Sequence, residues 1–231
     1  MKSILTLSLL VLCFLGYSQE NSEIVKTKDS KFNISFAVGP SFRLAKIPSD
    51  MSPEEKKILK ALKSGISYDF NLAYNINKNQ GFGLKFNMYQ SKASIGPVHF
   101  IEFNGEEGDG RISNNVKIYF IGPSYTTSTS INKDDFCANF AIGYSGYVGV
   151  SEGINSYTVK GSSLGLNVDV NYFFGLSDHF QIGPRIGLLQ GVISEFEIKG
   201  SNGFHETRKL DKNNKEGLLR LDLSVAFRYK L

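Results

Sequence analysis

The feature that most constrains this chain is an alternation of apolar and polar residues that recurs after residue 30. It is clearest in residues 66–76, 164–174 and 219–231, where every second residue is Ile, Leu, Val, Phe or Tyr. The residues between them are mostly Ser, Asn, Asp, Ala and Arg. A period of two gives an extended strand one apolar face and one polar face, so the pattern predicts β-strands.

Five further segments carry the same pattern less purely: 32–44, 81–95, 115–130, 136–150 and 180–198. In residues 115–130 the apolar side chains occupy both parities, which predicts a β-bulge near the middle of that strand. No stretch after residue 18 holds eighteen consecutive apolar residues, which argues against a helical membrane protein. The sequence therefore predicts eight strands.

The links between these strands alternate in length. Long links fall near residues 45–64, 96–114, 151–162 and 199–216, and short links rich in Asn, Asp and Ser fall at 77–80, 132–135 and 177–179. Transmembrane β-barrels have this layout, with short turns in the periplasm and longer loops outside. The predicted fold is all-β: an eight-stranded antiparallel up-and-down transmembrane β-barrel with both termini at the periplasmic end.

The size of the polar residues indicates which face is turned inward. Asn, Ser, Gly, Ala and Asp dominate the polar face, and small side chains suit the narrow lumen of an eight-stranded barrel. Aromatic residues on the apolar face lie toward strand ends, where the girdles of a membrane barrel are expected. The alternative is a soluble lipocalin-like carrier, whose apolar face would point inward.

Large charged residues of both signs also occupy the polar face. A buried charge without a partner is very costly, so we expect them to pair as a structural network that plugs the lumen. A proton or ion path along the lumen is the alternative. The predicted network comprises Arg43, Asp69, Lys85, Asp169, Arg185, Arg220, Asp222 and Arg228, and Lys117 is a further candidate.

The first residues resemble an export signal, with Lys2, an apolar run over 4–15, and Gly16-Tyr17-Ser18. We therefore expect a cleaved signal peptide over residues 1–18, a periplasmic N-terminal extension over 19–31 and an outer-membrane β-barrel over 32–231. Removing the signal leaves Cys137 as the only thiol, which excludes an internal disulfide. The predicted location is the bacterial outer membrane.

Several of these features together resemble the PorT-like outer-membrane β-barrel family. They are a signal followed by Gln19, an amphipathic last strand, and Gly-Pro pairs within strands at 39–40, 122–123 and 183–184. The resemblance implies an OmpA- or OmpX-like barrel and, as one alternative function, a component of an outer-membrane protein-secretion system. Since proline removes a hydrogen-bond donor, we expect each pair at a bulge or strand rim.

The expected partners follow from this location. They are outer-membrane lipid, an envelope protein that contacts residues 19–31, and the barrel-assembly machinery, whose signal the alternate apolar residues from Leu223 to Leu231 resemble. The net charge of +4 is scattered, without the basic block that nucleic acid requires. Nucleic acid is therefore not an expected partner.

Residues that could carry chemistry are few. His99, His179 and His205 fall in predicted links without a second ligand at metal spacing, and Gly105–Gly110 reads as an exposed acidic loop. We expect no catalytic residue, cofactor or metal, and a non-enzymatic structural or interaction module. The alternative is a lipid-modifying enzyme at the barrel rim, with His99 beside Glu102 or His205 beside Glu206.

One helix is expected in the first long link. Ser52, Pro53 and Glu55 form a helix start with a capping box, and Gly65 stands where a helix would stop. Ile58, Leu59 and Leu62 would lie on one side. The pattern predicts a helix over residues 53–64 whose apolar side packs on the barrel mouth or on other loops, with a partner-binding surface as the alternative.

Overall fold

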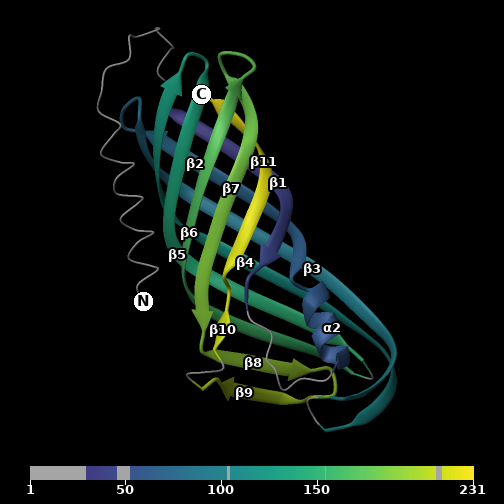
Figure 1. Cartoon of the computed structure of the whole chain (residues 1–231). Helices are drawn as coiled ribbons and strands as arrows, with labels where there is room; N and C mark the ends of the chain where they lie inside the picture. Colours follow the sequence, from purple (N-terminus) through teal and green to yellow (C-terminus); the bar gives the residue numbers. More distant parts are fainter. Residues whose placement is uncertain (1–29, 46–52, 103–104, 154, 212–214) are drawn as a thin grey trace, which may run out of the picture.

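The computed structural model describes residues 30–45, 53–102, 105–153, 155–211 and 215–231, and within them the chain closes into a ring of eight antiparallel strands (Figure 1). The last strand pairs with both the first and the seventh, which closes the ring. This confirms the predicted eight-stranded transmembrane β-barrel. The ring consists of β1 (Phe32–Arg43), β2 (Ser64–Asn75), β3 (Gln80–Ile101), β4 (Glu107–Ile131), β5 (Asp134–Glu152), β6 (Ser156–Gly175), β7 (Phe180–Ile193) and β11 (Arg220–Lys230).

One end of the ring, here called the turn end, holds three short turns together with the start of β1 and the end of β11 (Figure 1). The β4–β5 turn has only two residues between its strands, and Asn132 there adopts a φ of 61°, which Asn tolerates better than most residues. The backbone N–H of Lys230 donates to the His179 carbonyl at 2.8 Å, which ties the last strand to the β6–β7 turn.

The opposite end, here called the loop end, is built unevenly. β3 to β6 continue beyond the ends of β1, β2 and β11, and β8 (Glu195–Gly200) adds to β6 while β9 (His205–Lys209) adds to β8 (Figure 1). The short β10 (Glu216–Gly217) pairs with β7, and helix α2 (Pro53–Ala61) packs on β3. We call the outer ends of β3 to β6 with β8 and β9 the loop-end sheet.

Two of the predicted long links are mostly strand. β3 and β4 remain paired to Ile101 and Glu107, and β5 and β6 remain paired to Glu152 and Ser156. His99, expected in a loop, therefore lies in β3. His205, expected in the last long link, lies in β9, whereas His179 does lie in a turn. The alternation of apolar and polar residues weakens in these hairpins, because neither lipid nor a narrow lumen selects alternate residues there, while backbone pairing continues.

The predicted helix is present but shorter than expected. It ends at Ala61, and Gly65, expected as the stop, lies in β2 opposite Ser41 of β1. The expected cap residue Ser52 lies outside the described residues. Within the described part of the chain no helix is long and apolar enough to cross a membrane.

The expected bulges are absent where they were predicted. β4 keeps one register with β3 from Thr127 to Ile112, so the apolar residues of both parities are not explained by a shift. Pro40, Pro123 and Pro184 also interrupt no register and point outward. The register shift between β3 and β4 instead lies between Ile95 and Val98.

At the glycine before each of these prolines, backbone atoms of the neighbouring strand occupy the space that a side chain would fill. A Cβ added at Gly39 would overlap the Leu223 carbonyl oxygen, and one at Gly183 would overlap the Tyr172 carbonyl oxygen. The proline loses one ladder donor, but the absence of a side chain on the preceding residue preserves close strand contact. The Gly-Pro pairs therefore allow neighbouring strands to pack closely without a β-bulge.

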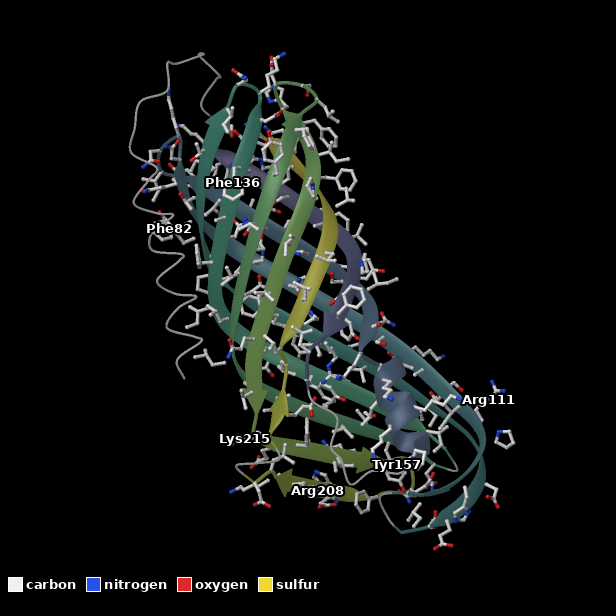
Figure 2. All side chains as sticks on the ribbon, viewed as in Figure 1. Phe82, Arg111, Phe136, Tyr157, Arg208 and Lys215 are labelled. Carbon is white, nitrogen blue, oxygen red and sulfur yellow. The ribbon has the colours of Figure 1, made fainter. Side chains whose placement is uncertain are left out.

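Burial alternates along the ring strands in the predicted sense. In β7 every odd residue from Gln181 to Ile193 is buried, whereas Ile186 and Val192 are exposed. Aromatic side chains such as Phe82 and Phe136 point away from the barrel near the turn end (Figure 2). Because the apolar faces of the ring strands point outward, a water-soluble carrier with an apolar interior is excluded.

Candidate functional site in the barrel lumen

A central polar layer crosses the lumen, and its charged side chains come from five of the eight ring strands, β2, β3, β6, β7 and β11. β-Strand alternation turns every second residue inward, so residues distant in sequence meet at the axis. Six of its members carry charge, three of each sign, and all six are buried. They are Asp69, Lys85, Asp169, Arg185, Arg220 and Asp222.

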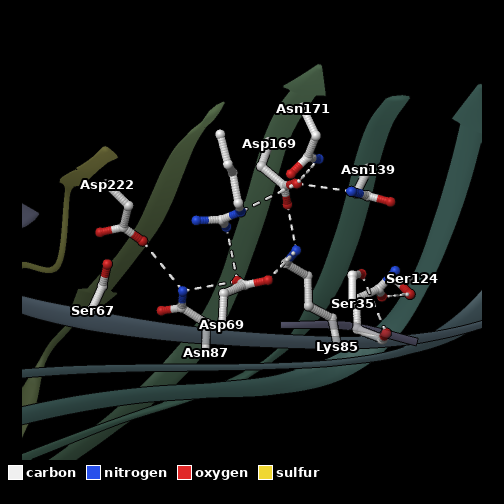
Figure 3. Close-up of polar contacts among 12 residues, drawn as sticks. Ser35, Ser67, Asp69, Lys85, Asn87, Ser124, Asn139, Asp169, Asn171 and Asp222 are labelled. Atoms are coloured by element: carbon white, nitrogen blue, oxygen red, sulfur yellow. Dashed lines mark hydrogen bonds and ion pairs between the residues drawn. The ribbon is translucent and has the colours of Figure 1, made fainter. Parts of the chain in front are cut away.

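Four of these charges form a closed set of ion pairs (Figure 3). Lys85 Nζ lies 3.0 Å from Asp69 Oδ1 and also pairs with Asp169. Arg185 spans the same two carboxylates, with 2.8 Å from Nη2 to Asp69 Oδ2 and 3.4 Å from Nε to Asp169 Oδ1. Two cations thus share two anions across β2, β3, β6 and β7.

The remaining pair joins this set through an amide. Arg220 Nε lies 2.9 Å from Asp222 Oδ1, which also accepts a 2.5 Å hydrogen bond from Ser41. The Asn87 amide nitrogen donates to Asp69 at 2.9 Å and to Asp222 at 3.2 Å (Figure 3). The Asn87 amide oxygen accepts a hydrogen bond from Arg220. The six charges therefore form one connected layer.

The central layer holds equal numbers of positive and negative side chains, so its net charge is zero. In a medium of low dielectric constant an unpaired ion costs several kcal/mol, whereas hydrogen-bonded pairs offset much of that cost. Asn139 and Asn171 each donate to Asp169, at 2.8 Å and 2.7 Å, and satisfy its remaining acceptor sites. The layer is balanced in charge and its carboxylates are well coordinated.

A second polar layer lies toward the turn end. Arg228 pairs there with Asp135 and donates to the Gln181 oxygen, and its guanidinium stands 4.4 Å from the centre of the Phe173 ring. Lys230 Nζ lies 2.6 Å from the same Asp135 carboxylate. Arg228 faces the lumen as the alternation predicts, whereas its partner Asp135 lies in one of the predicted short links and yet faces inward.

Toward the loop end the lumen is filled by apolar side chains under helix α2. Ile58 and Leu62 of the helix and the turn after it belong to one buried cluster with residues from β3, β4, β5, β7 and the segment before β11. The other members of this apolar plug are Tyr89, Ala93, Val116, Ile118, Phe120, Ala141, Leu189, Ile193 and Leu218. The apolar stripe of the helix thus packs on the barrel mouth, as predicted.

This apolar plug explains the mixed parity of β4. Val116, Ile118 and Phe120 are apolar and face the lumen, whereas Ile121 faces outward. Lys117 consequently points out of the barrel and is exposed, so its predicted place in the interior network is wrong. The prediction assumed a polar lumen along the whole strand, and the loop-end half of the lumen is apolar.

Arg43 lies at the edge of the apolar plug and not in the central layer. It pairs with Glu216 of β10, and its guanidinium is 5.9 Å from the centre of the Tyr147 ring. Arg220 similarly stands 5.3 Å from the Tyr89 ring, whose hydroxyl donates to the Leu62 carbonyl at 2.7 Å. These contacts connect the central charges, the apolar plug and the end of helix α2.

Among the predicted network residues, six form the central layer, Arg228 lies in the turn-end layer and Arg43 pairs at the loop end. Sequence reasoning missed the partners that complete these layers. Asp135 shares the inward parity of Cys137 and Asn139, and that signal predicts it. Glu216 lies in a predicted loop, where no alternation of inward and outward residues could have indicated its position.

The candidate chemical residues of the loop-end sheet lie in water. His99 Nδ1 is 3.0 Å from Asp109 and His205 Nε2 is 3.2 Å from Glu197, and all four side chains are well exposed. A hydrogen bond from Lys199 lowers the pKa of the Glu197 carboxyl below its usual range.

Glu102, expected at the rim beside His99, instead accepts hydrogen bonds from the next hairpin. The Asn155 amide donates to it at 2.7 Å and the Tyr157 hydroxyl at 3.2 Å. Glu107 of the expected acidic loop already belongs to β4. Within the described residues no group of three His, Cys, Asp or Glu side chains is arranged to hold a metal ion.

A closed ring with an apolar exterior and a filled lumen defines a small transmembrane β-barrel. The chain is similar in structure to a major outer membrane protein from Thermus thermophilus, with a TM-score of 0.57 and 13% identity, over 87% of this chain and 99% of that one. It is also similar to Neisserial surface protein A, with a TM-score of 0.50 and 13% identity, over 87% and 98% of the two chains. No protein-family model and no curated protein matches the sequence. At these identities the likeness shows a shared fold.

Proposed function

We propose that this chain is a non-enzymatic outer-membrane β-barrel that is closed to ions and acts as a structural or interaction module of the bacterial envelope. The observation that carries this proposal is the filling of the lumen by three successive layers. Salt-bridged charges occupy the centre and the turn end, and the apolar plug with helix α2 occupies the loop end.

The outer face supports the membrane location. Ring strands present large exposed apolar side chains on every side, among them Phe36, Phe70, Leu166 and Val225. A continuous apolar belt on a closed barrel is stable in lipid, where no open strand edge is tolerated. The turn end then faces the periplasm and the loop end faces outward, and export by residues 1–18, which lie outside the described residues, stays a prediction.

The loop-end sheet is the part of the module available to a partner outside the membrane. It rises on one side of the mouth, and its last strand, β9, pairs only with β8 among the described strands (Figure 1). Exposed Arg208 and Lys209 on this strand discourage uncontrolled pairing with other chains. We place an envelope protein partner here or at residues 19–31, and secretion-system membership stays the alternative that the PorT-like resemblance implies.

Two arrangements support a non-enzymatic role over the rim enzyme. A nucleophilic mechanism requires a hydroxyl or thiol within hydrogen-bond reach of a histidine. Among the described residues the side-chain hydrogen bonds and ion pairs of His99 and His205 are with carboxylates, and Glu102 accepts hydrogen bonds from Asn155.

The purified barrel is expected to carry no steady current in a planar bilayer at neutral pH. Salt-bridged side chains and the apolar plug leave ions no hydrated route, and a bare charge crossing an apolar region is very costly. Single-barrel recordings at several voltages measure this, with a wide-lumen channel in the same bilayer as the positive control. A current that rises in proportion to the number of inserted barrels would contradict a closed lumen.

A further inference from the structure

Three lysines stand together on the outside of the barrel, in contrast to the lysine and arginines paired inside it. They are Lys92 of β3, Lys117 of β4 and Lys160 of β6, here called the lysine band, and all three are exposed. Backbone pairing sets Gln90 beside Lys117, Lys117 beside Val148, and Val148 beside Lys160. The band therefore crosses four neighbouring strands.

Strand geometry sets the spacing within the lysine band. Lys117 and Lys160 are separated by two strand spacings, about 10 Å. Lys92 is diagonal to Lys117 on the neighbouring strand, where the backbone separation is about 7–8 Å. Flexible side chains at this spacing can reach one multiply charged group together.

The lysine band lies directly beyond the apolar belt on the loop-end side. On the outward face of β4, Lys117 is followed toward the turn end by Tyr119 and Ile121. The Tyr119 and Tyr144 rings lie 6.0 Å apart, an aromatic pair of the kind found at a membrane boundary. This position matches the level of lipid headgroups.

Among the described residues, the lysine band has one acidic cross-strand neighbour in register, Glu197. None of its three lysines forms an ion pair with a carboxylate of the described residues, and the outward face of β4 from Arg111 to Ile131 carries no acidic residue. Glu197, which lies beside Lys160 in register, is paired with Lys199 at 2.7 Å. An anion from outside the chain could therefore pair with these ammonium groups.

We infer that the lysine band binds the phosphate groups of an anionic lipid in the outer leaflet of the membrane. The inference rests on the proposed function for the orientation of the barrel. A phosphorylated lipid fits because its acyl chains meet the apolar belt while its headgroup meets the ammonium groups. The loop-end sheet rises from the same strands, so bound lipid would also support its base.

The test uses the full barrel in nanodiscs of phosphatidylcholine that contain either diphosphoryl lipid A or its dephosphorylated form. Native mass spectrometry counts the lipid A molecules retained by the wild type and by the triple variant Lys92→Gln, Lys117→Gln, Lys160→Gln. Each lysine near an anionic surface contributes about fivefold, so we expect retention to fall about a hundredfold in the triple variant. The wild type should not retain the dephosphorylated form.

A matched variant carries Arg111→Gln, Lys209→Gln and Lys215→Gln, three exposed cations at the loop end away from the belt (Figure 2 shows Arg111 and Lys215). It loses the same charge and should retain lipid A like the wild type. Equal losses of lipid A retention in both triple variants would contradict lipid binding by the lysine band. Displacement of lipid A by millimolar inorganic phosphate would contradict it as well. Heat-dependent gel mobility reports insertion separately, so a misfolded barrel is distinguished from a barrel that does not select lipid.

Discussion

Replacing Lys85 with Met is expected to destabilise the barrel by about 3–5 kcal/mol, because it leaves buried carboxylates with too few partners. Lys85 is fully buried and pairs with both Asp69 and Asp169. After the change three negative charges share two positive ones in the central layer. Urea unfolding of the barrel in detergent micelles, followed by circular dichroism, measures the free energy.

Two controls separate charge imbalance from simple loss of a long side chain. Lys209→Met removes an exposed lysine and should change stability by no more than about 0.5 kcal/mol. The double variant Lys85→Met, Asp169→Asn restores equal numbers of charges and should recover part of the loss. The account of the central layer fails if Lys85→Met is as mild as the exposed control.

Removing Phe227 to Leu231 is expected to abolish insertion into the membrane. These residues pair with Ile34 and Phe36 of β1 and with Gln181 and Ile182 of β7, so their loss opens the ring at the turn end. Open strand edges are not tolerated in lipid, and the truncation also removes Arg228 from Asp135. Fractionation of cell envelopes together with heat-dependent gel mobility measures insertion.

A deletion of equal length elsewhere serves as the control for this truncation. Removing His205 to Lys209 takes away β9, whose only described pairing is with β8 at the edge of the loop-end sheet. That variant should still insert, because the ring of eight strands is untouched. Normal assembly of the C-terminal truncation would refute the expectation and with it the role of the last strand as an assembly signal.

The sequence predicts the ring well because lipid and lumen impose opposite requirements on alternate residues. In β11 and in residues 164–174 of β6, outward residues meet lipid and inward residues meet a crowded axis, so the period of two is pure. The same reasoning fails outside the membrane. In β8, β9 and the outer ends of β3 to β6, neither lipid nor a narrow lumen selects alternate residues, although Tyr157 and Ile198 are buried. Backbone pairing continues there without a clear apolar alternation.

Residues that face the lumen can be predicted from the sequence only where the lumen is polar. Asp69, Asp169 and Arg185 can be identified in the sequence because they are charged residues on strand faces that otherwise carry small residues. The structure brings them together in one layer. Ile118 and Phe120 face inward too, but an apolar residue on the inner face carries no sequence mark that separates it from a lipid-facing one. Helix α2 reveals the reason, since its apolar stripe requires an apolar partner.

Bulky apolar side chains of the ring strands should face lipid while their neighbours in sequence face a closed lumen. The chain contains no Trp, so a single introduced Trp reports one position without background. Phe173 is 2% exposed and faces inward, whereas Phe174 is 48% exposed and faces outward, which makes them a matched pair. With brominated lipid, fluorescence of the Phe174→Trp variant should be strongly quenched and that of Phe173→Trp should be unchanged. Stronger quenching of Phe173→Trp than of Phe174→Trp would contradict the account.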